Sequence, residues 1–249
     1  MLYAALTFWL LVIVFSAWGV HRLWSRMIKP RAVNTVLLPG TLIAQLGHVL
    51  GLLITGNPVH NTKLMGDDEA GEPTADAPEK QRIPVVGPVL VGLLPLLACG
   101  GCLYLVAATL GRNMLVQDAS PDLPQTLPLT LAGFWGLLRT SITVTEDMLN
   151  AILHSDLLRW ANVLFLYLAV CLTVRMAPFE GSHRGAIGAI LLSGLIIGLV
   201  GSSVSALERA VLSSWPILNF AVGMLLFLLL VSLLVSGAVG LVRILARNE

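Results

Sequence analysis

The chain has 249 residues, of which 56% are hydrophobic and 12% charged, and its mean hydropathy is +0.85. Because soluble proteins carry about 25% charged residues, this composition excludes a soluble domain and predicts an all-α polytopic membrane protein. A net charge of +1 leaves no basic face for nucleic acid. The three cysteines lie in apolar runs, so we expect no extracellular disulfide framework.

The first apolar run covers residues 2–20, and basic side chains follow it at once: His21, Arg22, Arg26, Lys29 and Arg31. A cleaved signal peptide carries its positive charge first, so this order predicts a first transmembrane helix instead. By the positive-inside rule, the N-terminus of this helix lies outside and the basic cluster lies in the cytoplasm.

The second apolar run, residues 33–55, is long enough to cross a hydrocarbon core of roughly 30 Å. Pro39 and Gly40 predict a break or a kink near its start. Gln45 and His48 then fall near mid-depth, where polar side chains face other helices or water rather than lipid.

The next segment, residues 57–82, is an acidic loop that contains Pro and Gly and shows no apolar periodicity, so we expect it to be solvated. A third apolar run covers residues 83–110 and contains Pro84, Pro88 and Pro95. Such a run predicts either a kinked helix or two half-helices.

Residues 111–155 are mixed in character, and they predict a helix in the membrane interface or a re-entrant segment. Three further apolar runs, 157–174, 185–204 and 217–242, predict the fourth, fifth and sixth spans. The sequence therefore predicts a single transmembrane domain over residues 1–249, with about six helices, some of them kinked or re-entrant.

The arginines in the second half of the chain conflict with six complete crossings. If all six runs cross, Arg175, Arg184, Arg243 and Arg247 lie outside, contrary to the positive-inside rule. They return to the cytoplasm if the run at 33–55 or at 83–110 fails to cross, or if residues 129–155 add a crossing. The sequence leaves these alternatives open.

The most specific pattern in the chain is AQLGH at residues 44–48. Its spacing is that of an HExxH zinc-hydrolase helix, in which two His ligands lie one turn apart and the Glu acts as general base. Ala44 stands at the first His, Gln45 at the Glu and His48 at the second His. One ligand and the base are therefore absent.

The segment PGTLIAQLGHVLGLLITG, residues 39–56, resembles the site-2 protease family of intramembrane zinc metalloproteases, whose helix reads roughly PGxxxHExxHxxxAxxxG. Residues 85–95, VVGPVLVGLLP, are similar to the Gly/Pro-rich segment of that family. Residues 177–185, APFEGSHRG, look like its Pro-Ser-x-x-Asp-x-x-Gly turn. The three segments lie between residues 39 and 185, and the first is the specific one.

The resemblance implies roles for four positions. His48 matches the second zinc ligand, Gln45 the catalytic Glu, Ala44 the first His and Ser182 the Asp that supplies the third ligand. An amide cannot accept a proton as a carboxylate does, and a catalytic zinc usually has three protein ligands. We therefore expect no catalytic residues and no bound zinc.

A rebuilt metal site is the alternative at this position, because His48, Cys99 and Cys102 would offer ligands that zinc or copper accepts. Two cysteines separated by two glycines are more often packing residues. The remaining histidines in predicted loops, His60, His154 and His183, are expected to be solvated. His48 itself is expected to be a buried, hydrogen-bonded residue.

The resulting hypothesis is a non-catalytic, site-2 protease-like membrane protein that acts as a scaffold or regulatory partner. Its partners would be membrane lipids and other membrane proteins, and its expected location is the bacterial inner (plasma) membrane. Two alternatives stay open: an active intramembrane metalloprotease with a rebuilt site, and a small transporter or subunit of a membrane complex.

Overall fold

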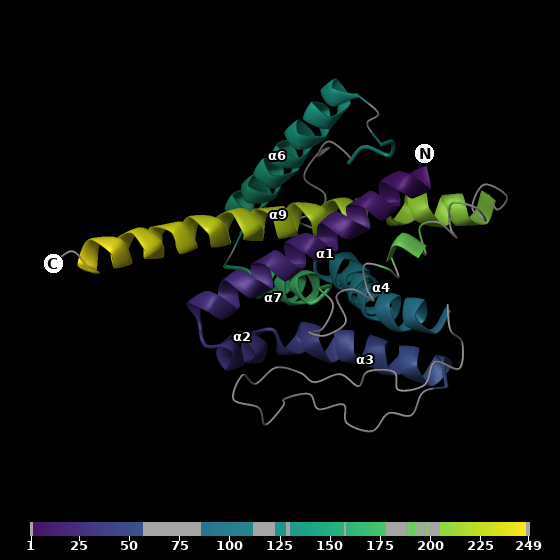
Figure 1. Ribbon diagram of the computed structural model, residues 1–249, viewed down its shortest axis with the longest axis horizontal. Helices are drawn as coiled ribbons and strands as arrows, with labels where there is room; N and C mark the ends of the chain where they lie inside the picture. Colours follow the sequence, from purple (N-terminus) through teal and green to yellow (C-terminus); the bar gives the residue numbers. More distant parts are fainter. Residues whose placement is uncertain are drawn as a thin grey trace.

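The computed structural model describes residues 2–56, 86–111, 123–127, 130–156, 158–177 and 205–247, with isolated positions between 188 and 198. Within these ranges the protein is helical and has no strand, which confirms the predicted all-α class (Figure 1). The helices are α1 Leu2–Met27, α2 Pro30–Val36, α3 Leu38–Ile54, α4 Val86–Thr109, α6 Leu131–His154, α7 Trp160–Val174 and α9 Ser205–Arg247.

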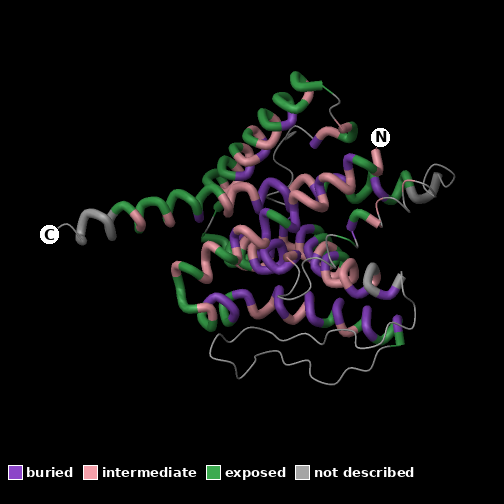
Figure 2. The backbone as a smooth tube through the Cα atoms, in the orientation of Figure 1, coloured by how far each residue is buried: buried purple, intermediate pink, exposed green. Residues whose placement is uncertain are grey.

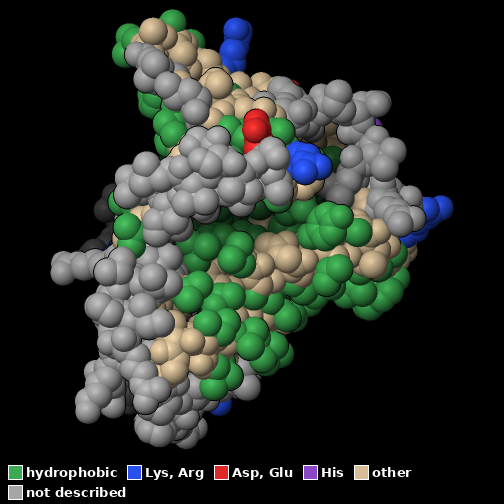
Figure 3. Space-filling model, turned by 90° about the vertical axis from the view of Figure 1, so that its right-hand side faces the viewer, with side chains coloured by type: hydrophobic (Ala, Val, Ile, Leu, Met, Phe, Trp, Pro, Cys, Tyr) green, Lys and Arg blue, Asp and Glu red, His purple; other side chains and the backbone are tan. Residues whose placement is uncertain are grey.

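Three helices are long and apolar enough to cross a membrane: α1, the Leu90–Thr109 part of α4 and the Glu208–Leu241 part of α9. The pair α2 and α3 adds a fourth if it counts as one span, whereas α7 has only 15 residues. Figure 3 shows that the described surface on one side is largely hydrophobic. The chain is thus an integral membrane protein with three or four candidate spans among the described residues. The predicted total of about six is not confirmed, and the run 185–204 lies mostly outside the described residues.

The predicted break in the second apolar run is confirmed, and it lies at Leu37. Helices α2 and α3 meet there at an angle of 82°. Pro39 occupies the first turn of α3, where its missing N–H costs nothing, whereas in one continuous helix its ring would clash with the carbonyl of Thr35. The proline therefore ends α2 and starts α3 instead of interrupting one helix.

Of the two alternatives for the third run, the structure has a single helix and not two half-helices, because α4 continues from Val86 to Thr109 with Pro95 inside it. Pro88 lies in the first turn, where the N–H groups have no partner within the helix. Pro84 lies outside the described residues. One proline in the helix interior can be accommodated where neighbouring helices cover the freed carbonyl.

Within the mixed segment 111–155, residues 131–154 form one helix, α6. The hydroxyl of Thr130 caps its start by accepting from the N–H of Gly133 at 3.1 Å. Only Leu137, Val144 and Met148 are buried, and most of the helix is exposed (Figure 2). Its placement in the membrane interface stays a prediction.

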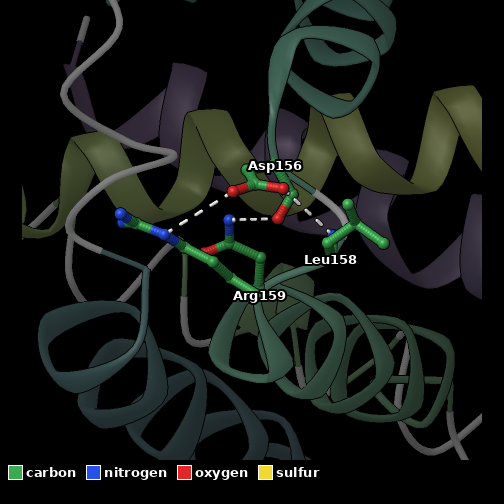
Figure 4. A network of polar contacts seen from close by, with 4 residues as sticks. Asp156, Leu158 and Arg159 are labelled. Carbon is green, nitrogen blue, oxygen red and sulfur yellow. Dashed lines mark hydrogen bonds and ion pairs between the residues drawn. The ribbon is translucent and has the colours of Figure 1, made fainter.

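Asp156 organises the turn between α6 and α7 (Figure 4). Its carboxylate accepts from the N–H of Leu158 at 3.2 Å and lies 3.7 Å from Nε of Arg159. Its backbone carbonyl accepts from the side chain of Asn162 at 2.9 Å. These contacts fix the turn directly before α7, which begins at Trp160.

Helix α9 begins at Ser205, twelve residues earlier than the predicted sixth span, and contains Pro216. Hydropathy identifies where the apolar part of a helix lies, not where the helix begins. The helix runs parallel to α1: Gly19 lies against Leu229, and Nε1 of Trp24 donates to Oγ of Ser232 at 2.7 Å. The C-terminal ends of α1 and α9 therefore point in the same direction (Figure 1).

Candidate functional site

One face of α3 carries the degenerate motif, and this face is buried. Its buried members recur every three or four residues: Gly40, Thr41, Ala44, Gln45, Gly47, His48, Gly51 and Leu52. The opposite face exposes Leu46, Leu50 and Leu53. Gln45 and His48 keep only 3% and 5% of their surface exposed, which confirms that they face the protein interior.

Two glycines of α3 allow its backbone to touch the backbone of α4. A Cβ on Gly47 would lie 2.7 Å from the carbonyl oxygen of Leu94 and from Cα of Pro95. A Cβ on Gly51 would lie 2.9 Å from Cα of Val91. Real Cβ atoms do not approach so closely, so glycine is required at both positions. The residue pairs also show that α3 and α4 are antiparallel.

The start of α3 packs just as closely on the end of α7. A Cβ on Gly40 would overlap the carbonyl oxygen of Cys171 and lie 3.1 Å from Cγ of Arg175. The Arg175 side chain is buried, and its Nη2 donates a hydrogen bond to Oδ1 of Asn34 on α2. Tyr167 of α7 donates to the carbonyl of Val36 at 2.8 Å. Helix α7 thus fixes the bend between α2 and α3.

The carbonyl of Val36 is also approached by Sγ of Cys171, at 3.4 Å. The thiol is thus a second donor to a backbone carbonyl at the bend, one residue before Leu37. A helix that ends at a sharp bend leaves carbonyls without partners in the same helix. The hydroxyl and thiol of α7 therefore replace hydrogen bonds that the bend removes.

The cysteines of the proposed rebuilt metal site do not converge with His48. Cys99 is buried in α4, and its Sγ lies 3.9 Å from the carbonyl oxygen of Arg175. Cys102, one turn later, is only partly buried. No group of three or more His, Cys, Asp or Glu side chains among the described residues is placed to hold a metal ion, and His48, Cys99 and Cys102 all belong to the described residues.

Three of the other predicted residues, Ser182, His60 and His183, lie outside the described residues. His154 is exposed as expected, but it is the last residue of α6 rather than part of a loop. Its Nδ1 lies 2.9 Å from the carbonyl oxygen of Asn150, one turn earlier. His154 is thus not part of the buried face of α3.

Sequence reasoning missed Arg175 and Asn34, which lie among the buried polar residues of this region. Arg175 follows directly after the apolar run 157–174, and at the level of sequence it serves only as a marker of topology. The available signal was its position: an arginine is costly to bury in an apolar environment unless it is paired, so it needs a partner on another helix. The sequence does not identify that partner, because Asn34 is 141 residues away.

The described site is therefore a junction of α2, α3, α4 and α7 whose polar side chains are buried between helices. Ala44 at its centre offers no ligand atom and is completely buried. Comparison with known protein families, with curated proteins and with solved structures finds no match to this chain. The resemblance of residues 39–56 to site-2 proteases stays a prediction.

Proposed function

We propose that this protein is a non-catalytic, site-2 protease-like membrane protein that acts as a scaffold or regulatory partner of other membrane proteins. The observation that carries the proposal is the use of the motif face of α3. Gly47 and Gly51 hold that face against the backbone of α4, and Ala44 is fully buried between helices. The motif positions serve helix packing.

The chemistry of the side chains supports the same proposal. The amide of Gln45 has no basic oxygen with which to deprotonate a water molecule, and general base catalysis requires such a group. Ala44 contributes no donor atom. His48 alone supplies one ligand where catalytic zinc usually takes three from the protein.

A topology with five crossings is consistent with the described helices. The crossings would be α1, the bent pair α2 and α3, α4, the run 185–204, and α9. Parallel α1 and α9 require an odd number of crossings if both span the membrane, whereas six is even. With the N-terminus outside, Arg175, Arg184, Arg243 and Arg247 return to the side of the basic cluster after α1, as the positive-inside rule demands.

Reporter fusions test this topology. A fusion after Glu249 and a fusion after Gly56 should report opposite sides of the membrane, with the fusion after Glu249 in the cytoplasm. Both reporters on the same side would exclude the five-crossing arrangement, and they would leave the question of catalysis untouched.

Zinc analysis tests the non-catalytic assignment. The purified chain should contain zinc far below one atom per molecule, and His48→Ala should leave that content unchanged. One zinc per chain that disappears in His48→Ala would contradict the proposal. A second variant, Cys99→Ala, separates a rebuilt site from a site that uses His48 alone, because only the former needs the thiol.

Mild-detergent purification tests the scaffold role. We expect a defined membrane protein to co-purify at fixed stoichiometry, and to be lost when Leu46 and Leu50, which are exposed on the outer face of α3, are replaced by Trp. The matched control replaces Leu234 and Leu241, which are exposed on α9. A preparation that contains this chain alone would contradict the scaffold role.

A second candidate, a transporter or a subunit of a membrane complex, is favoured by one feature. The 82° break between α2 and α3 lies beside the buried pair of Arg175 and Asn34, and broken helices with buried polar groups occur at transport sites. Solute flux into liposomes that contain only this chain would favour transport. Flux that appears only with a co-purified partner would favour the subunit.

A further inference from the structure

An apolar groove of about 310 Å³ lies between the C-terminal end of α1, helix α2 and the C-terminal half of α9. Its walls include Trp24 of α1, Ile28 directly after α1, Ala32 and Val36 of α2, and Val231 and Val235 of α9. The one polar pair in the lining, Nε1 of Trp24 and Oγ of Ser232, is joined by a hydrogen bond of 2.7 Å. The groove therefore offers nonpolar contacts to a molecule bound in it.

The residues that the structure describes leave this groove open. Ile28 keeps 53% of its surface exposed, Val36 56% and Val235 45%, although all three are apolar. The volume lies at the lower end of the range for ligand pockets, which starts at about 300 Å³. Covering this surface would contribute free energy in proportion to its apolar area.

Basic side chains surround the same end of α1. Arg22, Arg26, Lys29 and Arg31 are all exposed, and none of them forms an ion pair with another described residue. Arg22 lies over the ring of Trp18, 5.1 Å from its centroid. In sequence these cations alternate with groove residues: Arg26 and Lys29 flank Met27 and Ile28, and Arg31 precedes Ala32. An apolar groove thus adjoins a cluster of positive charge.

We propose that this groove binds one acyl chain of an anionic phospholipid, whose phosphate is held by Arg26, Lys29 and Arg31. The charge complementarity selects this occupant, because an apolar chain joined to an anion matches an apolar groove beside cations. The location agrees, since the groove lies where the candidate span of α1 ends and phospholipid headgroups lie at the ends of spans. The proposal is independent of the proposed scaffold role.

Native mass spectrometry of the full chain tests the proposal with three probes: phosphatidylglycerol, phosphatidylcholine with the same acyl chains, and glycerophosphate. Each cation near a lipid surface contributes a factor of roughly five in affinity. We therefore expect phosphatidylglycerol to be retained at least tenfold better than phosphatidylcholine. The combined variant Arg26→Gln, Lys29→Gln, Arg31→Gln should remove this preference, whereas Arg139→Gln with Arg209→Gln, two exposed arginines elsewhere, should keep it.

Filling the groove provides the second arm. Ala32→Phe should reduce the retention of both lipids at this site, and the matched variant Ala4→Phe, at an exposed alanine near the other end of α1, should not. Val235→Phe fills the groove from the opposite wall and replaces Ala32→Phe if that variant fails to fold.

Several results would overturn the proposal. Equal retention of the two phospholipids excludes the role of the cations. Retention unaffected by both Phe variants excludes the groove. Binding of glycerophosphate alone as strongly as the lipid identifies a phosphate site without an acyl chain, and a dimer abolished by Ala32→Phe or Val235→Phe identifies a second copy as the occupant.

Discussion

The α3–α4 contact and the α1–α9 contact join helices in different ways. Helix α3 approaches α4 backbone to backbone, through Gly47 and Gly51. Helices α1 and α9 are separated by large side chains, such as Leu229 over Gly19, and by the hydrogen bond from Trp24 to Ser232. The first contact cannot accept an added methyl group without moving a helix, whereas the second can adjust through rotamers. The degenerate motif therefore lies in the contact that is less able to accept larger side chains.

Replacing Gly47 by Leu should destabilise the α3–α4 contact and have the largest effect of the variants considered. A Cβ there would lie 2.7 Å from two backbone atoms of α4, so α3 and α4 must separate. We expect destabilisation of about 3 kcal/mol, seen as loss of monodisperse protein in detergent. The matched control is Gly101→Leu on α4, which has no heavy atom within 4 Å of its Cβ position and should remain folded. Equal behaviour of the two variants would show that the close contact is not required.

A double-mutant cycle on Arg175 and Asn34 should give the next largest effect. Their hydrogen bond joins a charged group to a neutral one in a buried place, so we expect a coupling energy of about 2 kcal/mol in equilibrium unfolding in mixed micelles. The control cycle uses Arg159 and Asp156, an exposed pair at 3.7 Å, where about 0.5 kcal/mol is expected. A larger coupling for the exposed pair would contradict this ranking.

Ser232→Ala measures the side-chain contact between α1 and α9. Removing the acceptor of the Trp24 indole should cost about 1 kcal/mol. When Ser232→Ala is already present, Trp24→Phe should lower the stability further only through the smaller ring, because the hydrogen bond is already lost. Ser213→Ala is the control, because its hydroxyl is exposed and bonds within its own helix, to the carbonyl of Ala210. If both serine variants lose equal stability, the interhelical bond contributes nothing.

Trp135→Ala should have the smallest effect on stability, below about 0.5 kcal/mol, because 70% of this side chain is exposed on α6. The same position tests whether α6 lies in the membrane interface. A polarity-sensitive probe attached to Trp135→Cys in liposomes should emit at shorter wavelength than the probe at Glu146→Cys. Identical emission at long wavelength from the two positions would place neither of them in lipid.

The sequence predicted the features that depend on one segment at a time. Residues 2–20 carry no charged side chain and form most of α1, and Pro39 predicted the break between α2 and α3. The burial of Gln45 and His48 followed from the cost of exposing polar groups to lipid. Each of these predictions needs only local composition and the chemistry of the environment.

Features that depend on two segments could not be predicted in this way. The continuity of α4 through Pro95 depends on neighbouring helices, and the partner of Arg175 is on α2. The requirement for glycine at positions 47 and 51 arises from the backbone of α4, which follows after more than thirty residues. The parallel arrangement of α1 and α9 likewise depends on every connection between them.

The length of α9 has a consequence for the kind of bilayer that this protein suits. Its apolar part, Glu208–Leu241, has 34 residues and measures about 51 Å, whereas a typical hydrocarbon core is roughly 30 Å thick. Such a helix must tilt strongly, extend beyond the core, or thicken the lipid around it. Because α1 packs along α9, a change in bilayer thickness would act on both helices together, and reconstitution into thicker membranes should favour the upright form.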